Sequence, residues 1–330
     1  MTNFTVSVVI PAFNCEKTIG QAIAAVLAQS YPVTAIVVVD DGSTDQTAKI
    51  VQTFPQVKYV YQKNAGPAAA RNHGAGEVKS HLVFFTDSDC IPQRNWIEKS
   101  VSHFQDEKVG AVAGSYGIAN PQNLLARCIH KEIIYRHQHL MPVYPKAFGS
   151  YNVGIQKIIF DKVGGFDAGY QSASGEDNDL SYKILKVGYK IYFEKDSLVD
   201  HFHTTRLKKY LWEQYRHGFW RVKMYQDHPQ MMTGDNYTFW KDMIEVPLAT
   251  LIAMNLMLAL ISFNLFLSTA VVLALFLFGL ELFFSFFMTN KISEIIFLSF
   301  TMFLRSFFRT FGFSSGILRF LSKKKQKEFK

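Results

Sequence analysis

The sequence has little cysteine and lacks the motifs of several large enzyme classes. Its three cysteines, Cys15, Cys90 and Cys128, show neither paired nor metal-type spacing. The N-terminus has no basic region followed by an apolar run of signal length, so we expect the first 240 residues to stay in a reducing cytoplasm. Neither Gly-x-Gly-x-x-Gly nor Gly-x-x-x-x-Gly-Lys-Ser/Thr occurs, which argues against a nicotinamide or ATP enzyme.

Charged residues become scarce after about residue 241. Two runs, 246–263 and 265–288, are long and apolar enough to cross a bilayer, and Glu281 is their only ionisable residue. We therefore expect a transmembrane hairpin over residues 244–290, behind a domain that occupies residues 1–240. The alternative is a buried core helix, but too few residues remain to build a domain around it.

The last apolar segment, residues 293–320, has a different pattern. Its less apolar side chains recur at helical spacing and form one stripe, made of Glu294, Thr301, Arg305, Arg309 and Gly312. This pattern favours an amphipathic helix at the membrane interface within residues 291–330, with a third membrane crossing as the alternative. The basic tail, residues 323–327, is expected to contact lipid headgroups on the cytoplasmic side.

The formal net charge of +8 might suggest a nucleic-acid partner. However, much of the excess lies next to the predicted membrane segments: Arg206, Lys208, Lys209, Arg216, Arg221, Lys223 and the lysine tail. Anionic membrane lipids are the simpler partner for these residues, so we expect no nucleic acid to bind.

The first ninety residues alternate between short apolar runs and amphipathic segments. Strands are expected at residues 6–10, 35–39, 57–61 and 82–86, and helices at 18–29, 44–53 and 68–78. A further apolar segment covers residues 191–199. The alternation of strand and helix predicts a doubly wound α/β domain.

Polar residues follow each of the four expected strands. The strand ends read Pro11-Ala12-Phe13-Asn14, Asp40-Asp41-Gly42-Ser43, Asn64-Ala65-Gly66 and Asp87-Ser88-Asp89. In doubly wound sheets the ligand lies beyond the carboxyl ends of the strands. One acidic pair after a strand is often an ordinary turn, but four polar strand ends in register predict a nucleotide site.

These residues resemble family 2 glycosyltransferases of the GT-A fold. The matching segments, within about residues 4–205, are 6–14, 37–45, 64–72, 84–89, 164–167 and 175–180. The resemblance implies a doubly wound mixed sheet, followed here by C-terminal transmembrane helices. It also implies inverting transfer of a hexosyl group from a UDP- or GDP-linked sugar.

The resemblance implies a metal site at the acidic triplet. In that family the triplet Asp87-Ser88-Asp89 holds the donor diphosphate through a divalent cation, and Asp89 is the closer ligand. Mg²⁺ or Mn²⁺ commonly takes one or two carboxylates together with substrate phosphates. His201 is a further metal ligand in this interpretation, with an ordinary surface or packed histidine as the equal alternative.

The resemblance also implies a pocket for the nucleotide sugar. Asp41 would contact the base, Asp40 would lie near the same pocket, and Arg71 would approach either the base-side acid or the diphosphate. The whole expected set is Pro11, Ala12, Asn14, Asp40, Asp41, Gly66, Arg71, Asp87 and Ser88. A carboxylate accepts from uracil or from guanine, so Asp41 does not separate UDP from GDP.

An inverting transferase needs a base opposite the leaving diphosphate. Glu176-Asp177 matches the family's position for this base, and the resemblance points to Asp177. Asp179 is the competing carboxylate, although we expect it to cap a helix over residues 180–187.

The acceptor is the least defined part of the prediction. The segment 214–218 lacks the spacing and the Trp of the Gln-x-x-Arg-Trp motif of processive members. We therefore expect transfer of single sugars to a lipid-linked or cell-surface glycan acceptor, during polysaccharide biosynthesis in the cell envelope. The enzyme is expected to be a multi-pass protein of the cell membrane with a cytoplasmic catalytic domain. The alternative enzyme is a polyprenyl-phosphate glycosyltransferase. A noncatalytic scaffold is disfavoured because Asp87, Asp89 and Asp177 are all present.

Overall fold

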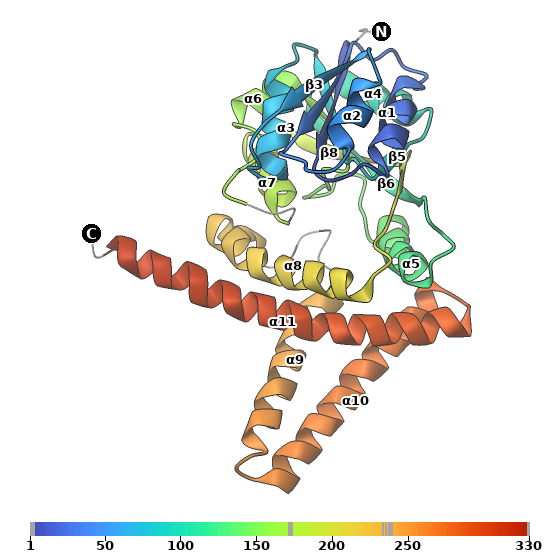
Figure 1. Ribbon diagram of the computed structural model, residues 1–330. Helices are drawn as coiled ribbons and strands as arrows, with labels where there is room; N and C mark the ends of the chain where they lie inside the picture. Colours follow the sequence, from blue (N-terminus) through green and yellow to red (C-terminus); the bar gives the residue numbers. More distant parts are fainter. Residues whose placement is uncertain (1–3, 171–173, 233, 235, 237–239, 329–330) are drawn as a thin grey trace. The chain divides into compact units, whose positions relative to one another are not determined.

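The structure is a computed structural model that describes residues 4–170, 174–232, 234, 236 and 240–328 (Figure 1). The chain divides into two compact units. The first comprises Met1–Asn120 and Arg136–His203, and the second comprises Pro121–Tyr135 and Thr204–Lys330. The lysines predicted to contact headgroups, residues 323–327, lie outside the part of the chain whose side chains are described.

The first unit is built on an eight-stranded sheet in the order β3-β2-β1-β4-β7-β6-β8-β5. Its strands are β1 (Val6–Ala12), β2 (Ala35–Asp40), β3 (Val57–Tyr61), β4 (Leu82–Thr86), β5 (Cys90–Pro92), β6 (Val109–Ile118), β7 (Asn152–Gln156) and β8 (Lys190–His201). The four strands nearest the N-terminus pair in parallel, while β7 runs antiparallel to both β4 and β6. The predicted doubly wound mixed sheet is therefore confirmed.

Helices cover both faces of this sheet (Figure 1). One face carries α1 (Ile19–Leu27), α2 (Thr47–Gln52) and α4 (Trp96–Val101), and the other carries α3 (Pro67–Gly76), α6 (Lys157–Lys162) and α7 (Glu176–Lys186). Central strands between two helical layers are buried on both faces, which explains their nearly continuous apolar sequence.

Strands β5, β6 and β7 were not predicted from the sequence pattern. One of them, β7, pairs with both β4 and β6. It begins with Asn152 and contains Gly154, neither of which is typical of a central strand. Gly154 is required by packing, because a Cβ there would lie 2.6 Å from the ring of Phe84. Asn152 also has a specific partner, because its side-chain oxygen accepts a 2.6 Å hydrogen bond from Trp96 Nε1.

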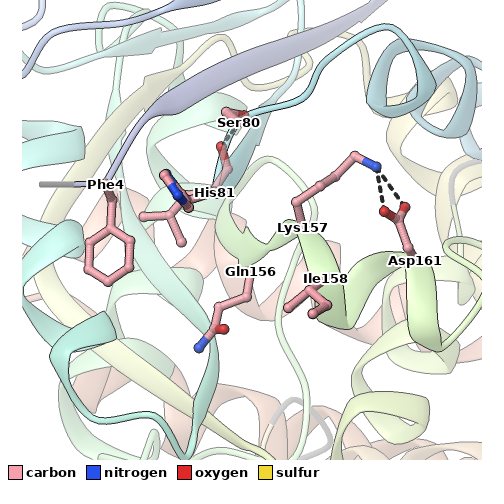
Figure 2. A pocket seen from close by; sticks show the side chains of 8 residues that line it. Phe4, Ser80, His81, Gln156, Lys157, Ile158 and Asp161 are labelled. Atoms are coloured by element: carbon pink, nitrogen blue, oxygen red, sulfur yellow. Dashed lines mark hydrogen bonds and ion pairs between the residues drawn. The ribbon is translucent and has the colours of Figure 1, made fainter. Parts of the chain in front are cut away.

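A pocket of about 410 Å³ lies at the amino ends of β1 and β4 (Figure 2). Its lining includes Phe4, which precedes β1, and His81, which precedes β4. Figure 2 also shows the ion pair between Lys157 and Asp161, whose Nζ and Oδ2 atoms are 2.6 Å apart. This pocket is at the sheet edge opposite the polar strand ends, so it is separate from the predicted nucleotide site.

The second unit is helical. Its helices are α8 (Leu207–Asp227), α9 (Trp240–Leu258), α10 (Phe263–Met288) and α11 (Ile292–Glu328), together with the first turns of α5 (Leu124–His139). In Figure 1, α9 and α10 meet at a narrow tip and diverge from it, while α8 and α11 lie side by side across the wide end of this hairpin.

The first expected membrane segment differs from the helix that forms. Helix α9 starts at Trp240 and ends at Leu258, whereas the apolar run was expected to extend over residues 246–263. The earlier start is explained by ion pairs, since Lys241 contacts both Glu245 and Glu281 while all three side chains are buried. Among the described residues, Phe263–Met288 and Ile292–Phe320 are long and apolar enough to cross a membrane, which weakly suggests membrane association.

The less apolar stripe of α11 is a packing surface inside the second unit. Glu294, Thr301 and Arg305 are each 1% exposed. A Cβ added at Gly312 would lie 1.9 Å from the carbonyl oxygen of Tyr215 on α8, so glycine is needed for this close helix contact. These residues therefore face neighbouring helices. There Glu294 pairs with Arg127 of α5, and Arg305 pairs with Glu132 of α5 and Glu245 of α9.

Candidate active site

The predicted nucleotide site lies at the carboxyl ends of the parallel strands. Ala12 of β1 is in register with Asp40 of β2, and Val9 is in register with Phe85 of β4. The residues that follow these strands therefore leave the sheet along the same edge. Pro11 and Ala12 are buried at the end of β1.

The loops after β1 and β2 are held together by Asn14. Its backbone N–H donates to Ser43 Oγ at 2.9 Å, and its side-chain oxygen accepts from the backbone N–H of Thr44 at 2.8 Å. Asn14 has a φ of 48°, a left-handed conformation that asparagine tolerates better than most residues. These hydrogen bonds hold the two loops together on one side of the predicted pocket.

Asp41 organises the loop that precedes α3. Its two carboxylate oxygens accept from the backbone N–H groups of Ala65 and Gly66 at 2.8 and 2.9 Å, and from Gln62 Nε2 at 2.7 Å. Gly66 has a φ of 91°, which a residue with a side chain rarely adopts. Asp41 and Gly66 thus together fix the conformation of the loop before α3.

Asp40 is buried and has two partners in the same region. It accepts from the backbone N–H of Ser43 at 2.8 Å and from the hydroxyl of Tyr59 at 2.8 Å. Burial and the bond to Asp40 raise the pKa of Tyr59 to about 12, so the tyrosine remains a donor at neutral pH. Asp40 therefore anchors the loop between β2 and α2.

Arg71 joins the acidic triplet to the start of α7. Its Nη2 lies 2.8 Å from Asp87 Oδ1, and its Nη1 lies 3.1 Å from Glu176 Oε1. Burial alone would lower the pKa of Arg71, but the two carboxylates outweigh burial and raise the pKa above its ordinary value. Of the two expected positions for Arg71, the structure shows the one beside the acidic triplet, at Asp87.

Asp89 faces the histidine that was predicted as a metal ligand. His201 Nε2 lies 3.4 Å from Asp89 Oδ2, because β5 pairs with β8 and brings Cys90 into register with His201. Potential ligand atoms of Asp89, Cys90 and His201 all lie within 4.8 Å of one another. Ser88, between the two aspartates, lies near the thiol of Cys15 in the β1 loop.

The chemistry of these donors fits a divalent cation of the Mn²⁺ or Mg²⁺ type. Carboxylate oxygen suits both ions, and imidazole nitrogen suits Mn²⁺ better. Thiolate sulfur is a soft donor that suits zinc or copper, so Cys90 is a poor ligand for Mn²⁺ or Mg²⁺. Asp89 and His201 are therefore the fitting pair, while the near oxygen of Asp87 is engaged by Arg71.

Asp177 lies in the first turn of α7. Helix α7 begins at Glu176, right after Gly175, whose φ of 98° turns the chain into the helix. Burial raises the pKa of Asp177, although the nearby Arg71 guanidinium opposes this rise. Burial and the adjacent Asp177 raise the pKa of Glu176 to about 7. A carboxyl with a raised pKa is suited to accept a proton.

The helix at this position starts earlier than predicted. We expected a helix over residues 180–187 with Asp179 as its cap, but α7 covers Glu176–Lys186 and Asp179 lies within its first turn. There Asp179 Oδ2 forms a 2.6 Å ion pair with Lys183 Nζ. This pairing favours Asp177 over Asp179 as the reactive carboxylate.

Two side chains have a larger role than the sequence indicated. Glu176 is 2% exposed and accepts from the backbone N–H of Ser174 in addition to Arg71, so it positions the guanidinium. His203 is buried, and its Nδ1 lies 2.9 Å from Nδ1 of His201. The His-x-His spacing after β8 was visible in the sequence, but the contact itself depends on the β5–β8 pairing.

Known proteins that are similar to this chain are glycosyltransferases. Residues 7–164 match the family model described as glycosyl transferase family 2. A pre-mycofactocin glycosyltransferase of Mycobacterium tuberculosis is 30% identical over 234 residues, covering 68% of this chain and 48% of the relative. A probable glycosyltransferase of Bacillus subtilis, YdaM, is 33% identical over 205 residues, covering 57% of this chain and 48% of the relative. The chain thus spans about half the length of these relatives.

Solved structures show the same fold. The mannosyltransferase PcManGT from Pyrobaculum calidifontis, solved with GDP-Man and Mn²⁺, superposes with a TM-score of 0.55 at 21% identity, covering 70% of this chain and 65% of that one. GalNAc-T7, solved with UDP, GalNAc and Mn²⁺, gives a TM-score of 0.50 at 19% identity, covering 69% of this chain and 52% of that one.

The chain therefore contains a family 2 glycosyltransferase domain with the GT-A fold. The family match ends at residue 164, before Asp177 and His201, so it does not test the roles predicted for these two residues.

Proposed function

We propose that this protein transfers a sugar from a nucleoside diphosphate sugar to an acceptor hydroxyl with inversion at the anomeric carbon. The observation that carries the proposal is the double ion pair of Arg71 with Asp87 and Glu176. It holds the acidic triplet, which would face the diphosphate, against the loop of Asp177, which would face the acceptor. The donor and acceptor groups of the reaction would thereby be brought into one site.

The donor would lie against the rigid loops after β1 and β2. Pro11, Ala12 and Asn14 would flank the base on one side, and Asp41 would contact its edge with Asp40 and Gly66 keeping the loops in place. The carboxylate of Asp41 already accepts three hydrogen bonds, so it is held in one orientation before the nucleotide binds. A preorganised pocket of this kind lowers the ordering cost of binding.

Asp89 and His201, with Asp87 and Ser88 next to the diphosphate, would hold a divalent cation, Mn²⁺ or Mg²⁺. When bound, such a cation supplies the positive charge that offsets the negative charge of the leaving diphosphate. The relatives of known structure that contain Mn²⁺ support this assignment. Arg71 would add a fixed cation on the same side, because its guanidinium contacts Asp87 directly.

Asp177 would take the proton of the acceptor hydroxyl. Inversion follows from a single in-line displacement, in which the acceptor oxygen attacks the anomeric carbon from the side opposite the diphosphate. The bond to the acceptor oxygen forms as the bond to the diphosphate oxygen breaks, and the hydroxyl proton moves to the Asp177 carboxylate.

The acceptor would be a lipid-linked or cell-surface glycan at the cytoplasmic face of a membrane. The apolar helices of the second unit support membrane attachment by their length and composition. A polyprenyl phosphate is the alternative acceptor, and it would yield a lipid-phosphate sugar.

A donor screen tests this proposal. Purified protein would be titrated with UDP- and GDP-sugars in the presence of Mn²⁺ or Mg²⁺, then assayed for transfer to membrane lipid extracts and to polyprenyl phosphate. We expect Asp89→Ala to lose donor binding and Asp177→Asn to keep it while losing transfer. The control Asp161→Asn, at the opposite sheet edge, should behave like the wild type. The proposal fails if no nucleotide sugar binds, or if Asp89→Ala binds and reacts as the wild type does.

A further inference from the structure

The hairpin of α9 and α10 has two chemically different ends. We call the end where α9 starts and α10 finishes the hairpin base, and residues 259–262 the hairpin tip. At the base, Lys241 Nζ lies 2.7 Å from Glu281 Oε2 and also contacts Glu245. Arg305 of α11 joins the same network, with Nη2 3.0 Å from Glu245 Oε1. The base therefore gathers charged side chains from three helices.

The hairpin tip is apolar and exposed. Leu260 is 91% exposed and Ile261 is 81% exposed. Residues 246–280, which contain the tip, include no Asp, Glu, Lys, Arg, His, Trp or Tyr. A loop that emerges on the far side of a bilayer meets headgroups and water, where charged residues and aromatic anchors are usual. This tip suits hydrocarbon instead.

The shorter arm limits how deeply the tip can reach. The uncharged part of α9, from Val246 to Leu258, rises only about 20 Å as a helix. The hydrocarbon core of a bilayer is about 30 Å thick. Helix α10 is longer, but its arm diverges from α9 and ends at the same base (Figure 1). Since both arms share one tip, the depth that α9 allows applies to the whole hairpin.

Helices α8 and α11 indicate that the base lies at the membrane surface. Both helices cross the wide end of the hairpin (Figure 1). Their backbones touch at Gly218 of α8, where a Cβ would lie 2.1 Å from the carbonyl oxygen of Arg309. Helix α8 exposes Lys208 and Lys209, which require water or headgroups. A helix held directly against α8 must also be shallow, so α11 does not cross the membrane despite its composition.

We propose that the α9/α10 hairpin enters the bilayer from one face, ends inside the hydrocarbon and returns without crossing. The inference rests on the proposed membrane attachment and replaces the two crossings expected from composition. The partner of the hairpin is the acyl-chain layer of a bilayer, and the charged base stays in the headgroup region of the face from which the hairpin enters.

Cysteine accessibility at the tip tests the proposal. Ser262→Cys and Lys209→Cys would be made in the full chain, and sealed vesicles of both orientations would be treated with a membrane-impermeant maleimide. The wild type gives the background, which comes from the half-buried Cys15, because Cys90 and Cys128 are buried. We expect Lys209→Cys to react from one face, and Ser262→Cys to react from neither face until the protein is denatured in detergent.

Each other outcome contradicts the proposal in a distinguishable way. Labelling of Ser262→Cys from the face opposite to Lys209→Cys would mean that the hairpin crosses, while membrane attachment would stand. Labelling of both variants from the same face, together with release of the protein by alkaline washing, would show that the hairpin is outside the bilayer. In that case the proposed membrane attachment would fail as well.

A charge at the tip provides a second measurement. Ser262→Arg would place a guanidinium in hydrocarbon, so the fraction of protein retained in alkaline-washed membranes should fall by roughly tenfold or more. The control Gln226→Arg adds the same charge at an exposed position of α8 and should leave retention unchanged. Wild-type retention of Ser262→Arg would place the tip in water and overturn the proposal.

Discussion

The guanidinium of Arg71 on α3 donates to Asp87 after β4, with 2.8 Å between Nη2 and Oδ1. Its other terminal nitrogen donates to Glu176 at 3.1 Å, so one buried cation bridges the buried Glu176 and the half-buried Asp87. A planar guanidinium serves two carboxylates at fixed angles, which an ammonium group does not. Arg71 is therefore the residue on which the arrangement of the site depends most directly.

Replacing Arg71 should destabilise the first unit as well as impair catalysis. Arg71→Met leaves Asp87 and Glu176 without their cation, and breaking a buried ion pair in this way costs about 3–5 kcal/mol. Thermal unfolding followed by circular dichroism should show a clearly lower midpoint. The exposed pair of Lys58 and Glu77 provides the control, since Lys58→Met should change the midpoint little. Equal midpoints for Arg71→Met and the wild type would contradict the role of Arg71.

Metal selectivity should depend on His201. Because imidazole is a better ligand for Mn²⁺ than for Mg²⁺, His201→Ala should weaken Mn²⁺ binding by about tenfold and Mg²⁺ binding much less. Asp89→Asn should weaken both. Binding is measured by calorimetry or by the electron paramagnetic resonance signal of free Mn²⁺, with Asp161→Asn as an exposed control. Equal losses for both ions in His201→Ala would argue against ligation by this histidine.

The pH dependence of transfer should report the proposed base. Burial raises the pKa of Asp177 above 3.8, and only the ionised carboxylate accepts a proton, so kcat/KM should fall as the pH drops through this raised value. Arg71 lowers the pKa of Asp177, so Arg71→Gln should move the acidic limb to higher pH. The acidic limb should stay in place in the control Asp161→Asn. An unmoved limb in Arg71→Gln would show that Arg71 does not lower the pKa of the group that limits the reaction.

Glu176 should make the stability of the first unit pH-dependent. Its pKa is raised to about 7 from 4.5, so the folded state binds more protons than the unfolded state between these values. Stability is therefore greatest at low pH within this window and decreases as the pH rises through about 7, by roughly 1–3 kcal/mol. Glu176→Gln cannot ionise and should flatten the slope in a series of thermal melts. A slope of the same size in this variant would assign the effect to other groups.

Close helix packing in the second unit should tolerate no side chain at Gly312. A Cβ there would lie 1.9 Å from the carbonyl oxygen of Tyr215, so Gly312→Ala must push α11 away from α8. We expect a lower melting temperature and a lower yield of folded protein. At Gly279 on α10 no atom lies within 4 Å of an added Cβ, so Gly279→Ala is the matched control and should be neutral or slightly stabilising.

The alternation of elements was readable from the sequence because it depends on local periodicity. Val6–Ala12 and Leu82–Thr86 are continuous apolar runs, as expected of strands buried on both faces. The end of each apolar run also located the polar residues that follow the strand. Strand β7 was missed because its Asn152 and Gly154 meet demands of distant residues, Trp96 and Phe84, which no local pattern contains.

The sequence by itself determined the GT-A domain, the acidic triplet, the position of Asp177 and the apolar character of the C-terminal helices, since each is written in consecutive residues. Only the tertiary structure decided that Arg71 binds Asp87 and Glu176, that His201 faces Asp89, and that the charged start of α9 is buried at the hairpin base. The physical reason is the same in each case. These contacts join groups far apart along the chain, and the pairing of strands and helices, which local sequence does not encode, sets their distances.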